Sequence, residues 1–244
     1  MIFHPVLDRQ AVRDRLHHPT VDPPVPQEEE NHPWQPPYSF PRFQEPLLRV
    51  WDDVTGSPPE DDNRMMSRAP ERRLDDRESR QKSLCKHFNY CNWTPSPYIS
   101  FTTSAARVED LAEKRVSKGR GPQMLTVIDP NIRLRKGLPI LNAKDEMDYY
   151  GIRDPYGMGY KYYYDEYLCL WQVTEAEVIG HWEWADLNAY GADWYRNIIL
   201  PAFRDFTATA DSTLGLFAEP EVCPPTEQST DDLASMLAKL SGMF

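Results

Sequence analysis

Short apolar or alternating runs, separated by polar and proline-bearing stretches, predict five β-strands along the chain. The runs are rich in aliphatic, aromatic and β-branched residues, the composition that pleated, partly buried strands favour. They cover residues 47–51, 98–101, 124–128, 166–173 and 177–182. Apolar residues at helical spacing predict four helices between and after the strands, over residues 74–89, 105–118, 142–150 and 190–203. Ser104 is the expected cap of the second helix, and we expect the fourth to break near Pro201.

This order of strands and helices, with mostly antiparallel strand signals, predicts an α+β domain. We expect it to occupy residues 47–206. Residues 1–46 are rich in proline and acidic residues and are interpreted as an extended N-terminal arm, because such a segment buries too little apolar surface to offset its ordering entropy. Residues 207–230 are interpreted as a linker. Residues 231–244 are expected to form an amphipathic C-terminal helix that docks on a partner or on a second copy.

The chain has 244 residues and a formal net charge of −11, which limits the classes of function. A nucleic-acid binder held by phosphate contacts needs a basic face, so this class is disfavoured, although an enzyme that touches nucleic acid briefly is not excluded. Its four cysteines form no C-x-x-C pair, as expected of a reducing compartment. With neither a secretory leader nor a membrane-spanning run, we expect a cytoplasmic or nuclear protein.

Three polar residues stand inside or at the start of predicted strands. Arg49 lies between Leu48 and Val50, Ser100 lies between Ile99 and Phe101, and Glu166 opens a strand. A buried guanidinium requires an anion or an acceptor, and a carboxylate at a strand end is fixed by backbone pairing. Taken singly, each has a structural explanation, such as an internal salt bridge, a small filler or an exposed acid. No metal-binding spacing and no Gly-rich phosphate loop accompanies them, so we expect no metal.

Their order resembles the arginine–serine–glutamate signature of mono-ADP-ribosyltransferases of the cholera-toxin type. Leu47-Leu48-Arg49 is similar to the family's Leu-Tyr-Arg, and the stretch from Tyr98 to Ser104 is similar to its aromatic–aliphatic–Ser-Thr-Ser strand. Asp165-Glu166 is similar to the family's glutamate before a strand, followed at a similar distance by Val178-Ile179-Gly180. The resemblance covers roughly residues 47–185. The same core also resembles an uncharacterised domain family of fungal proteins.

The resemblance implies two packed sheets around a cleft for NAD, as a split β-sandwich with flanking helices. It implies that NAD is the substrate, that Glu166 stabilises the oxocarbenium-like transition state, and that Ser100 holds Glu166 in place. Arg49 would bind the pyrophosphate side, with His87 and Thr102 as further NAD-binding residues. The Tyr-rich loop before Glu166 implies acceptor recognition by Tyr160, Tyr162 and Tyr164.

Two departures from the family pattern leave the function open between two classes. Arginine-modifying members carry a second acid two positions before the glutamate, where this chain has Tyr164. The serine strand reads Ser-Phe-Thr-Thr-Ser, which places its second hydroxyl farther from the first. The first hypothesis is an NAD-dependent ADP-ribosyltransferase, or an NAD glycohydrolase if water is the acceptor. The alternative is a binding or scaffold protein on the same fold that has lost catalysis. The acceptor is left open among protein, nucleic acid and water.

Overall fold

The computed structural model describes residues 5–17, 28–36, 41–91 and 93–217. The chain divides into two compact units, Met1–Ala208 and Thr209–Phe244. Both sheets belong to the first unit, and the described part of the second is the end of one helix. The predicted C-terminal helix over residues 231–244 and most of the predicted linker lie outside the described residues.

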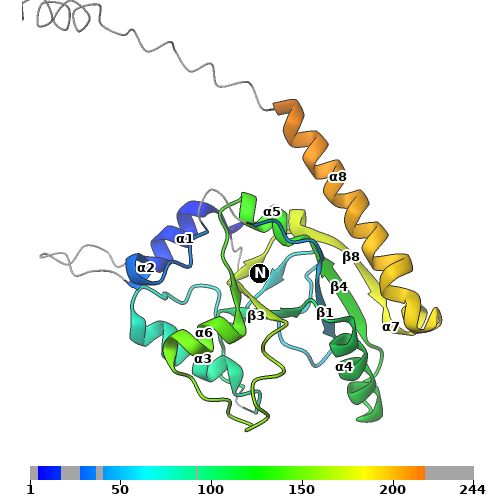
Figure 1. Cartoon of the computed structure of the whole chain (residues 1–244), viewed down its shortest axis with the longest axis horizontal. Coiled ribbons are helices and arrows are strands. Elements are labelled where there is room, and N and C mark those ends of the chain that lie inside the picture. Colours follow the sequence, from blue (N-terminus) through cyan, green and yellow to red (C-terminus); the bar gives the residue numbers. More distant parts are fainter. Residues whose placement is uncertain (1–4, 18–27, 37–40, 92, 218–244) are drawn as a thin grey trace, which may run out of the picture. The chain divides into compact units, whose positions relative to one another are not determined.

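Six strands form one antiparallel sheet in the order β5-β6-β3-β1-β4-β8 (Figure 1). They are β1 (Leu47–Trp51), β3 (Tyr98–Thr102), β4 (Met124–Ile128), β5 (Ile140–Asn142), β6 (Glu166–Leu170) and β8 (Val178–Glu183). A second sheet has two strands, β2 (Met65–Met66) and β7 (Gln172–Val173). Together with the helices, the sheets confirm the predicted α+β class.

The predicted strand over residues 166–173 is interrupted at Trp171. Trp171 has φ of 61°, in the left-handed region, and separates β6 from β7. Its buried indole donates to the carbonyl of Arg72 at 2.8 Å, and its amide donates to the carbonyl of Pro97. The tertiary contacts of one large side chain therefore redirect the strand into the second sheet.

The six-stranded sheet divides between β1 and β3. These two strands share a single register pair, Leu48 with Thr102, whereas β3 and β6 share five. The prediction of two packed sheets around a cleft is therefore not met as stated: the main sheet is a single six-stranded one, whose halves β5-β6-β3 and β1-β4-β8 share one register pair. Beyond that point the backbone groups of the diverging strands need other partners.

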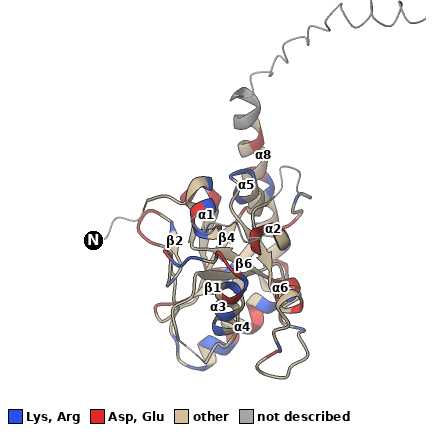
Figure 2. Ribbon diagram, turned by 90° about the vertical axis from the view of Figure 1, so that its left-hand side faces the viewer, with Lys and Arg blue, Asp and Glu red and all other residues tan. Residues whose placement is uncertain are grey.

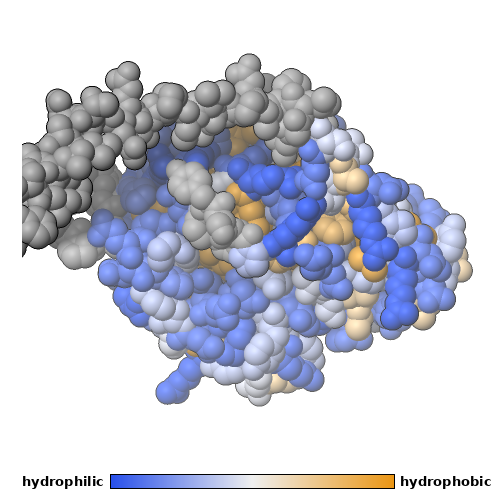
Figure 3. Space-filling model, turned by 45° about the horizontal axis from the view of Figure 1, so that its top comes forward, coloured by the Kyte–Doolittle hydropathy of each residue, from blue (hydrophilic) through white to orange (hydrophobic). Residues whose placement is uncertain are grey.

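Helices surround the sheet. The α-helices are α1 (Arg9–Leu16), α2 (Glu28–Asn31), α3 (Arg77–Phe88), α4 (Ala105–Ser117), α5 (Pro130–Arg135), α6 (Ala143–Tyr150), α7 (Trp184–Asn188) and α8 (Leu200–Phe217). Two short 3-10 segments are η1 (Glu175–Glu177) and η2 (Gly191–Asp193), and η3 (Tyr195–Ile199) is π-helical. Helix α4 packs on β1 and β3, and α6 packs on β5 and β6 (Figure 1). One face of the molecule is mostly hydrophilic, with small apolar areas between the polar residues (Figure 3).

Helix α4 positions one wall of the candidate site, and its start was predicted. Ser104 Oγ accepts a hydrogen bond from the amide of Arg107 at 3.3 Å, which satisfies one of the free donors at the helix N-terminus. Val108 and Ala112 are buried against Leu48 and Val50 of β1. The cap and this apolar face fix the side of α4 that lies beside the sheet.

We expect Ser104→Ala to lower the free energy of unfolding by about 1 kcal/mol, because an amide at the helix start loses its acceptor. Urea unfolding measures the change. Ser117→Ala is the matched control: its hydroxyl donates to the carbonyl of Lys114 at the exposed end of the same helix, so its removal should change stability little. Equal losses in the two variants would contradict the assignment of Ser104 as the cap.

The expectation of an extended arm over residues 1–46 is wrong for the parts that the structure describes. Leu7, Val12 and Leu16 on and before α1 are buried in the same core cluster as Trp34. Glu29 forms a buried ion pair with Arg80 of α3 at 2.6 Å. The proline-rich composition of the whole segment suggested an extended arm, but the short helix α1, capped by Asp8, buries Val12 and Leu16 in the core.

The predicted helix break and linker also need correction. Pro201 is the second residue of α8, and the chain passes through the π-helical η3 immediately before it. In the first turn of a helix the missing amide of proline costs no hydrogen bond, so α8 continues to Phe217, well into the predicted linker. Thr207 is buried and donates to Asp129 at 3.0 Å, which ties this part of α8 to the domain.

Candidate functional site

A cavity of about 490 Å³ opens where β1 and β3 diverge. Its walls come from β1, β3, the start of β6, α4, the end of α3 and the loops after β1 and α3. The volume lies within the range of small-molecule sites. A split in a sheet is a natural place for such a site, because the strands hold side chains rigidly while the gap leaves room between them.

Arg49 spans the gap from β1. Its Nη1 donates to the carbonyl of Ser100 at 2.9 Å, and its Nη2 donates to the carbonyl of Gly56 at 2.6 Å. Burial and the nearby Arg115 lower the pKa of Arg49 to about 10, so it remains protonated at neutral pH. Its buried Nε has no protein partner. Arg49 therefore links the two halves of the sheet and places at the cavity wall a positive charge that forms no ion pair with any described carboxylate.

A chain of hydrogen bonds leads to Glu166 from the back of the cavity. His87 Nδ1 lies 2.8 Å from Ser96 Oγ, and His87 Nε2 lies 2.8 Å from Ser100 Oγ. Burial, with Arg49 as the next cause, lowers the pKa of His87 to about 3, so the ring is neutral and has one donor and one acceptor nitrogen.

The proton positions in this chain follow from the carboxylate at its end. The Ser100 hydroxyl hydrogen bonds to Glu166, and an ionised carboxylate can only accept. Ser100 must then receive its own hydrogen bond from His87 Nε2–H, and Ser96 must donate to Nδ1. The order Ser96, His87, Ser100, Glu166 fixes the tautomer of the histidine and aims the serine proton at the carboxylate.

Glu166 is 5 % exposed and opens β6, where backbone pairing with Thr102 holds it. Burial raises its pKa above the usual 4.5, while hydrogen bonds from Ser100 and Tyr90 act in the opposite direction. The Tyr90 hydroxyl donates to Oε2 at 2.9 Å. Tyr90 in turn stacks on Tyr156, with ring centroids 5.7 Å apart and planes at 6°. A desolvated carboxylate held by two hydroxyl groups is ready to stabilise positive charge in a ligand.

Basic residues dominate the rest of the cavity. Among the described residues that line it, seven are Lys or Arg and Glu166 is the single acid; the seven are Arg49, Arg68, Arg107, Lys114, Arg115, Lys118 and Arg120. Helix α4 supplies three of them and its C-cap Lys118 a fourth, and the helix carries both signs of charge along its length (Figure 2). The whole chain is strongly acidic, so this local excess of positive charge indicates an anionic ligand.

Two of these basic residues are held by one buried acid outside the lining. Asp52 is 2.7 Å from Arg120 and 4.0 Å from Arg115. Burial opposes ionisation of Asp52, but the hydrogen bonds from Arg120 and Thr55 prevail and lower its pKa to about 2. Arg115 also donates to the carbonyl of Val50 on the diverging strand at 2.9 Å. These residues brace the cavity wall, whereas Arg49, Arg68 and Arg107 pair with no carboxylate of the described chain.

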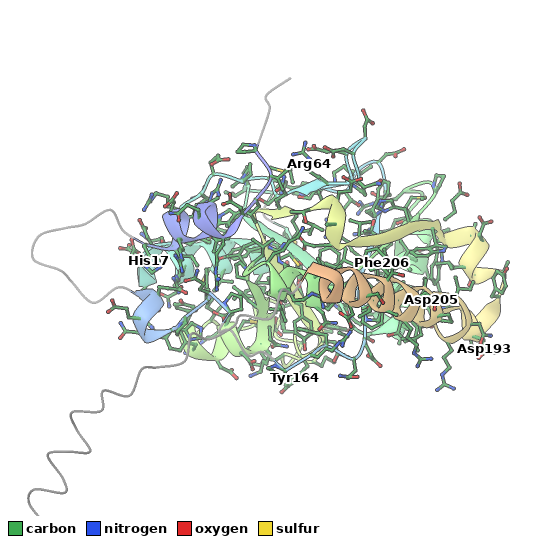
Figure 4. The ribbon with its side chains drawn as sticks, turned by 90° about the horizontal axis from the view of Figure 1, so that it is seen from above. His17, Arg64, Tyr164, Asp193, Asp205 and Phe206 are labelled. Atoms are coloured by element: carbon green, nitrogen blue, oxygen red, sulfur yellow. The ribbon has the colours of Figure 1, made fainter. Side chains whose placement is uncertain are left out.

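The structure brings together five residues that the sequence singled out and leaves three aside. Arg49, His87, Ser100, Thr102 and Glu166 all line the cavity. Tyr160, Tyr162 and Tyr164 do not line it. Tyr162 lies on Arg107, whose guanidinium carbon is 4.3 Å from the ring centroid. Lys144 contacts the rings of Tyr160 and Tyr164, and Tyr164 is 58 % exposed at the periphery (Figure 4).

Several residues of the site were missed from the sequence. Tyr90 follows α3 in a segment with no strand or helix pattern, and only the fold brings its hydroxyl to Glu166. Arg107 and Lys114 on one face of α4, with Lys118 at its C-cap, repeat at a spacing that is visible in the sequence as a cationic stripe. Because this stripe directly follows the serine-bearing strand, the two together could have predicted an anion site from the sequence.

Three other kinds of feature would indicate a function in the described part of the chain: metal ligands, cysteine pairs and membrane-spanning helices. No group of three potential metal ligands occurs among the described residues. Cys85, Cys91 and Cys169 are free thiols there, and Cys169 is buried in the core. None of the described helices combines the length and apolar character that crossing a lipid bilayer requires.

The fold and the cavity together define an α+β protein with a cation-lined cavity where its antiparallel sheet divides. Residues 44–187 match the family described as a domain of unknown function, DUF7587. The match covers more than half of the chain and includes all six strands of the main sheet, so the chain belongs to this family. Comparison with curated proteins finds no match.

Proposed function

We propose that the chain is an NAD-dependent mono-ADP-ribosyltransferase, or an NAD glycohydrolase where water is the acceptor. One observation carries this proposal: Arg49 from β1, Ser100 from β3 and Glu166 from β6 line the same cavity. These are the residues whose order resembles the arginine–serine–glutamate signature. On this proposal, the two halves of the sheet correspond to the split β-sandwich of such enzymes.

The composition of the cavity fits the two charged regions of NAD. The diphosphate requires cations, and within the described residues Arg49 and Arg107 form no ion pair with a carboxylate. The ribose beside nicotinamide becomes positively charged as the glycosidic bond breaks, and of the described residues that line the cavity Glu166 is the single acid. His87 and Thr102 would complete the pocket on either side of Ser100.

The residues support cleavage by electrostatic stabilisation. The bond between nicotinamide nitrogen and ribose C1′ breaks with its electron pair leaving on nicotinamide. Glu166 stabilises the oxocarbenium-like ribose, and its burial strengthens this effect. Ser100 and Tyr90 keep the carboxylate oriented, so little reorganisation is needed during the reaction. An acceptor then bonds to C1′ and releases its proton to solvent.

A catalytically inactive binding protein is the second candidate, favoured by one observation. The position of the second acid of arginine-modifying members is occupied by Tyr164, which is exposed and outside the cavity. Arginine as acceptor is therefore not supported. On the first proposal, Tyr160, Tyr162 and Tyr164 would instead contact the acceptor beside the cavity.

Calorimetry with NAD tests the proposed substrate. Binding of NAD that is lost in the presence of excess diphosphate would support the assignment of the cationic cavity. Absence of NAD binding by the folded chain would refute both the enzyme and an NAD-binding scaffold. Binding without release of nicotinamide on long incubation would favour the scaffold.

The pH dependence of nicotinamide release should report on Glu166. The carboxylate must be ionised, so activity falls as pH drops through its raised pKa, and the acid limb should lie above pH 4.5. Tyr90→Phe removes a hydrogen bond that lowers this pKa. We expect its acid limb to move to higher pH and its maximal rate to fall roughly 10-fold.

Tyr156→Phe is the control for this prediction. It keeps the ring that stacks on Tyr90 but removes a hydroxyl that contacts Cys91 and not Glu166. Its acid limb should therefore match that of the unmodified chain. A Tyr90→Phe profile with an unshifted acid limb would show that the Tyr90 hydroxyl does not act on Glu166.

A further inference from the structure

The mouth of the cavity carries exposed cations and exposed aromatic rings together. This rim consists of Arg68, Tyr90, Trp93, Leu111, Lys114 and Lys118, all of which also line the cavity. Trp93 is 62 % exposed and Tyr90 50 %. The Arg68 guanidinium carbon lies 5.6 Å from the Trp93 ring centroid, and its Nη1 donates to the Trp93 carbonyl at 2.9 Å. Tyr90 belongs both to this rim and to the group around Glu166, because its hydroxyl donates to the carboxylate. Trp93, Lys114 and Lys118 make no contact with Glu166.

The positive charge of the rim is available to a ligand. Arg68 and Lys118 have no carboxylate within ion-pair distance in the described part of the chain. Lys114 is 3.9 Å from Asp110, and both side chains are more than 60 % exposed, so this pair is weak. In a chain of net charge −11, a phosphate backbone is attracted here and repelled elsewhere. The acidic composition of the whole chain thus disfavours a large nucleic-acid interface. It still permits a nucleic acid to make a small contact at the rim.

The aromatic rings select among anionic partners. Every nucleobase has a flat face that stacks on an indole or phenol, and cations beside such rings are the usual combination in proteins that bind single strands. An acidic peptide would satisfy the cations but leave the exposed face of Trp93 uncovered. A base paired within a duplex could not reach Glu166, which is 5 % exposed inside the cavity. The rim therefore fits an unpaired nucleotide.

We propose that the acceptor of ADP-ribose is a single-stranded nucleic acid that binds at the rim. Its base stacks on Trp93, and its phosphates contact Arg68, Lys114 and Lys118. This rests on the proposed function. In the step, the bond from ribose C1′ to nicotinamide breaks, a nitrogen of the base bonds to C1′, and that nitrogen loses its proton to solvent. No oxidant, reductant or metal is required.

Binding is measured by fluorescence anisotropy with labelled single strands of DNA and RNA long enough for one site, about 4–16 nucleotides. A duplex and a polyglutamate peptide serve as competitors. We expect single strands to bind better than either. Trp93→Ala should weaken binding on the order of 10-fold through lost stacking. Lys114→Ala/Lys118→Ala should reduce the slope of log affinity against log salt by about 1.4, two contacts at about 0.7 each.

The matched control is Lys82→Ala/Lys86→Ala, which removes two exposed lysines of α3 that do not line the cavity. It should change neither affinity nor salt slope. Equal weakening by the two double variants would refute a specific site at the rim. If polyglutamate displaces the oligonucleotide at equal total charge, the proposal of a nucleic-acid partner is overturned in favour of an acidic protein.

Transfer is followed with NAD labelled in its adenylate phosphate, together with nicotinamide release in the same reaction. Label on the oligonucleotide, lost in Trp93→Ala, supports the proposal. Nicotinamide release with no labelled oligonucleotide overturns this acceptor and leaves the proposed NAD chemistry standing. Oligonucleotide binding with neither release nor label overturns the proposed NAD chemistry and with it the transfer, and leaves only a nucleotide-binding rim.

Discussion

Glu166→Gln is expected to lower the rate of nicotinamide release about 100-fold or more, the size of effect that follows loss of one preorganised electrostatic group. Glutamine keeps the shape of the side chain and can still accept from Tyr90 and Ser100. It removes the negative charge that faces the ribose. Because the site is buried and the charge poorly screened, this loss should act on the rate of cleavage more than on NAD affinity.

Asp165→Asn provides the control, because Asp165 is the adjacent acid and is exposed. Its carbonyl accepts from the amide of Thr103, a contact that the substitution leaves in place. We expect its rate to match that of the unmodified chain. A Glu166→Gln variant with full activity, or equal losses in the two variants, would show that Glu166 is not the catalytic carboxylate.

Arg49→Gln is expected to raise the dissociation constant for NAD on the order of 100-fold, the cost of removing one partner from a buried charge pair. The guanidinium is held by two carbonyl groups on opposite sides of the gap and is protonated at neutral pH. The dissociation constant of Arg49→Lys should lie between those of the unmodified chain and Arg49→Gln, because lysine keeps the charge but cannot reproduce the planar fork of the guanidinium. Calorimetry on each variant measures the change.

Stability must be followed in the same variants, because Arg49 also joins the two halves of the sheet. Loss of the bonds to the Ser100 and Gly56 carbonyls should lower the free energy of unfolding by about 1–3 kcal/mol. Arg64→Gln is the matched control, since Arg64 pairs with Asp62 on a loop outside the cavity. A folded Arg49→Gln chain that binds NAD as tightly as the unmodified chain would contradict the role given to Arg49.

Local sequence patterns predicted much of the strand framework. Leu47–Trp51 and Met124–Ile128 are strands over the predicted residues, because short, mostly apolar runs rich in Leu, Val, Ile and Trp favour strands. The start of α4 at Ser104 was likewise specified by a cap and an apolar face. The three residues of the proposed signature lie on β1, β3 and β6, which are neighbours in the sheet in the order β6-β3-β1. This order brings all three to one cavity.

The remaining features depend on tertiary contacts. Trp171 ends β6 because its indole is anchored to Arg72, a partner almost a hundred positions away. The divergence of β1 from β3 depends on the guanidinium of Arg49 replacing backbone bonds, which no local pattern specifies. Tyr90 reaches Glu166 from an irregular segment. The docking of the N-terminal segment was missed because its composition was averaged over many prolines, whereas Leu7, Val12 and Leu16 are enough to bury this part of it in the core.

Release of nicotinamide from NAD labelled in the nicotinamide ring tests the central claim most directly. The unmodified full-length chain is incubated with NAD, with and without single-stranded oligonucleotide, alongside Glu166→Gln and Asp165→Asn. We expect release by the unmodified chain and by Asp165→Asn, and a rate lower by about 100-fold or more in Glu166→Gln. No release by the unmodified chain under any of these conditions, or release that is unaffected by Glu166→Gln, would contradict the proposed enzyme.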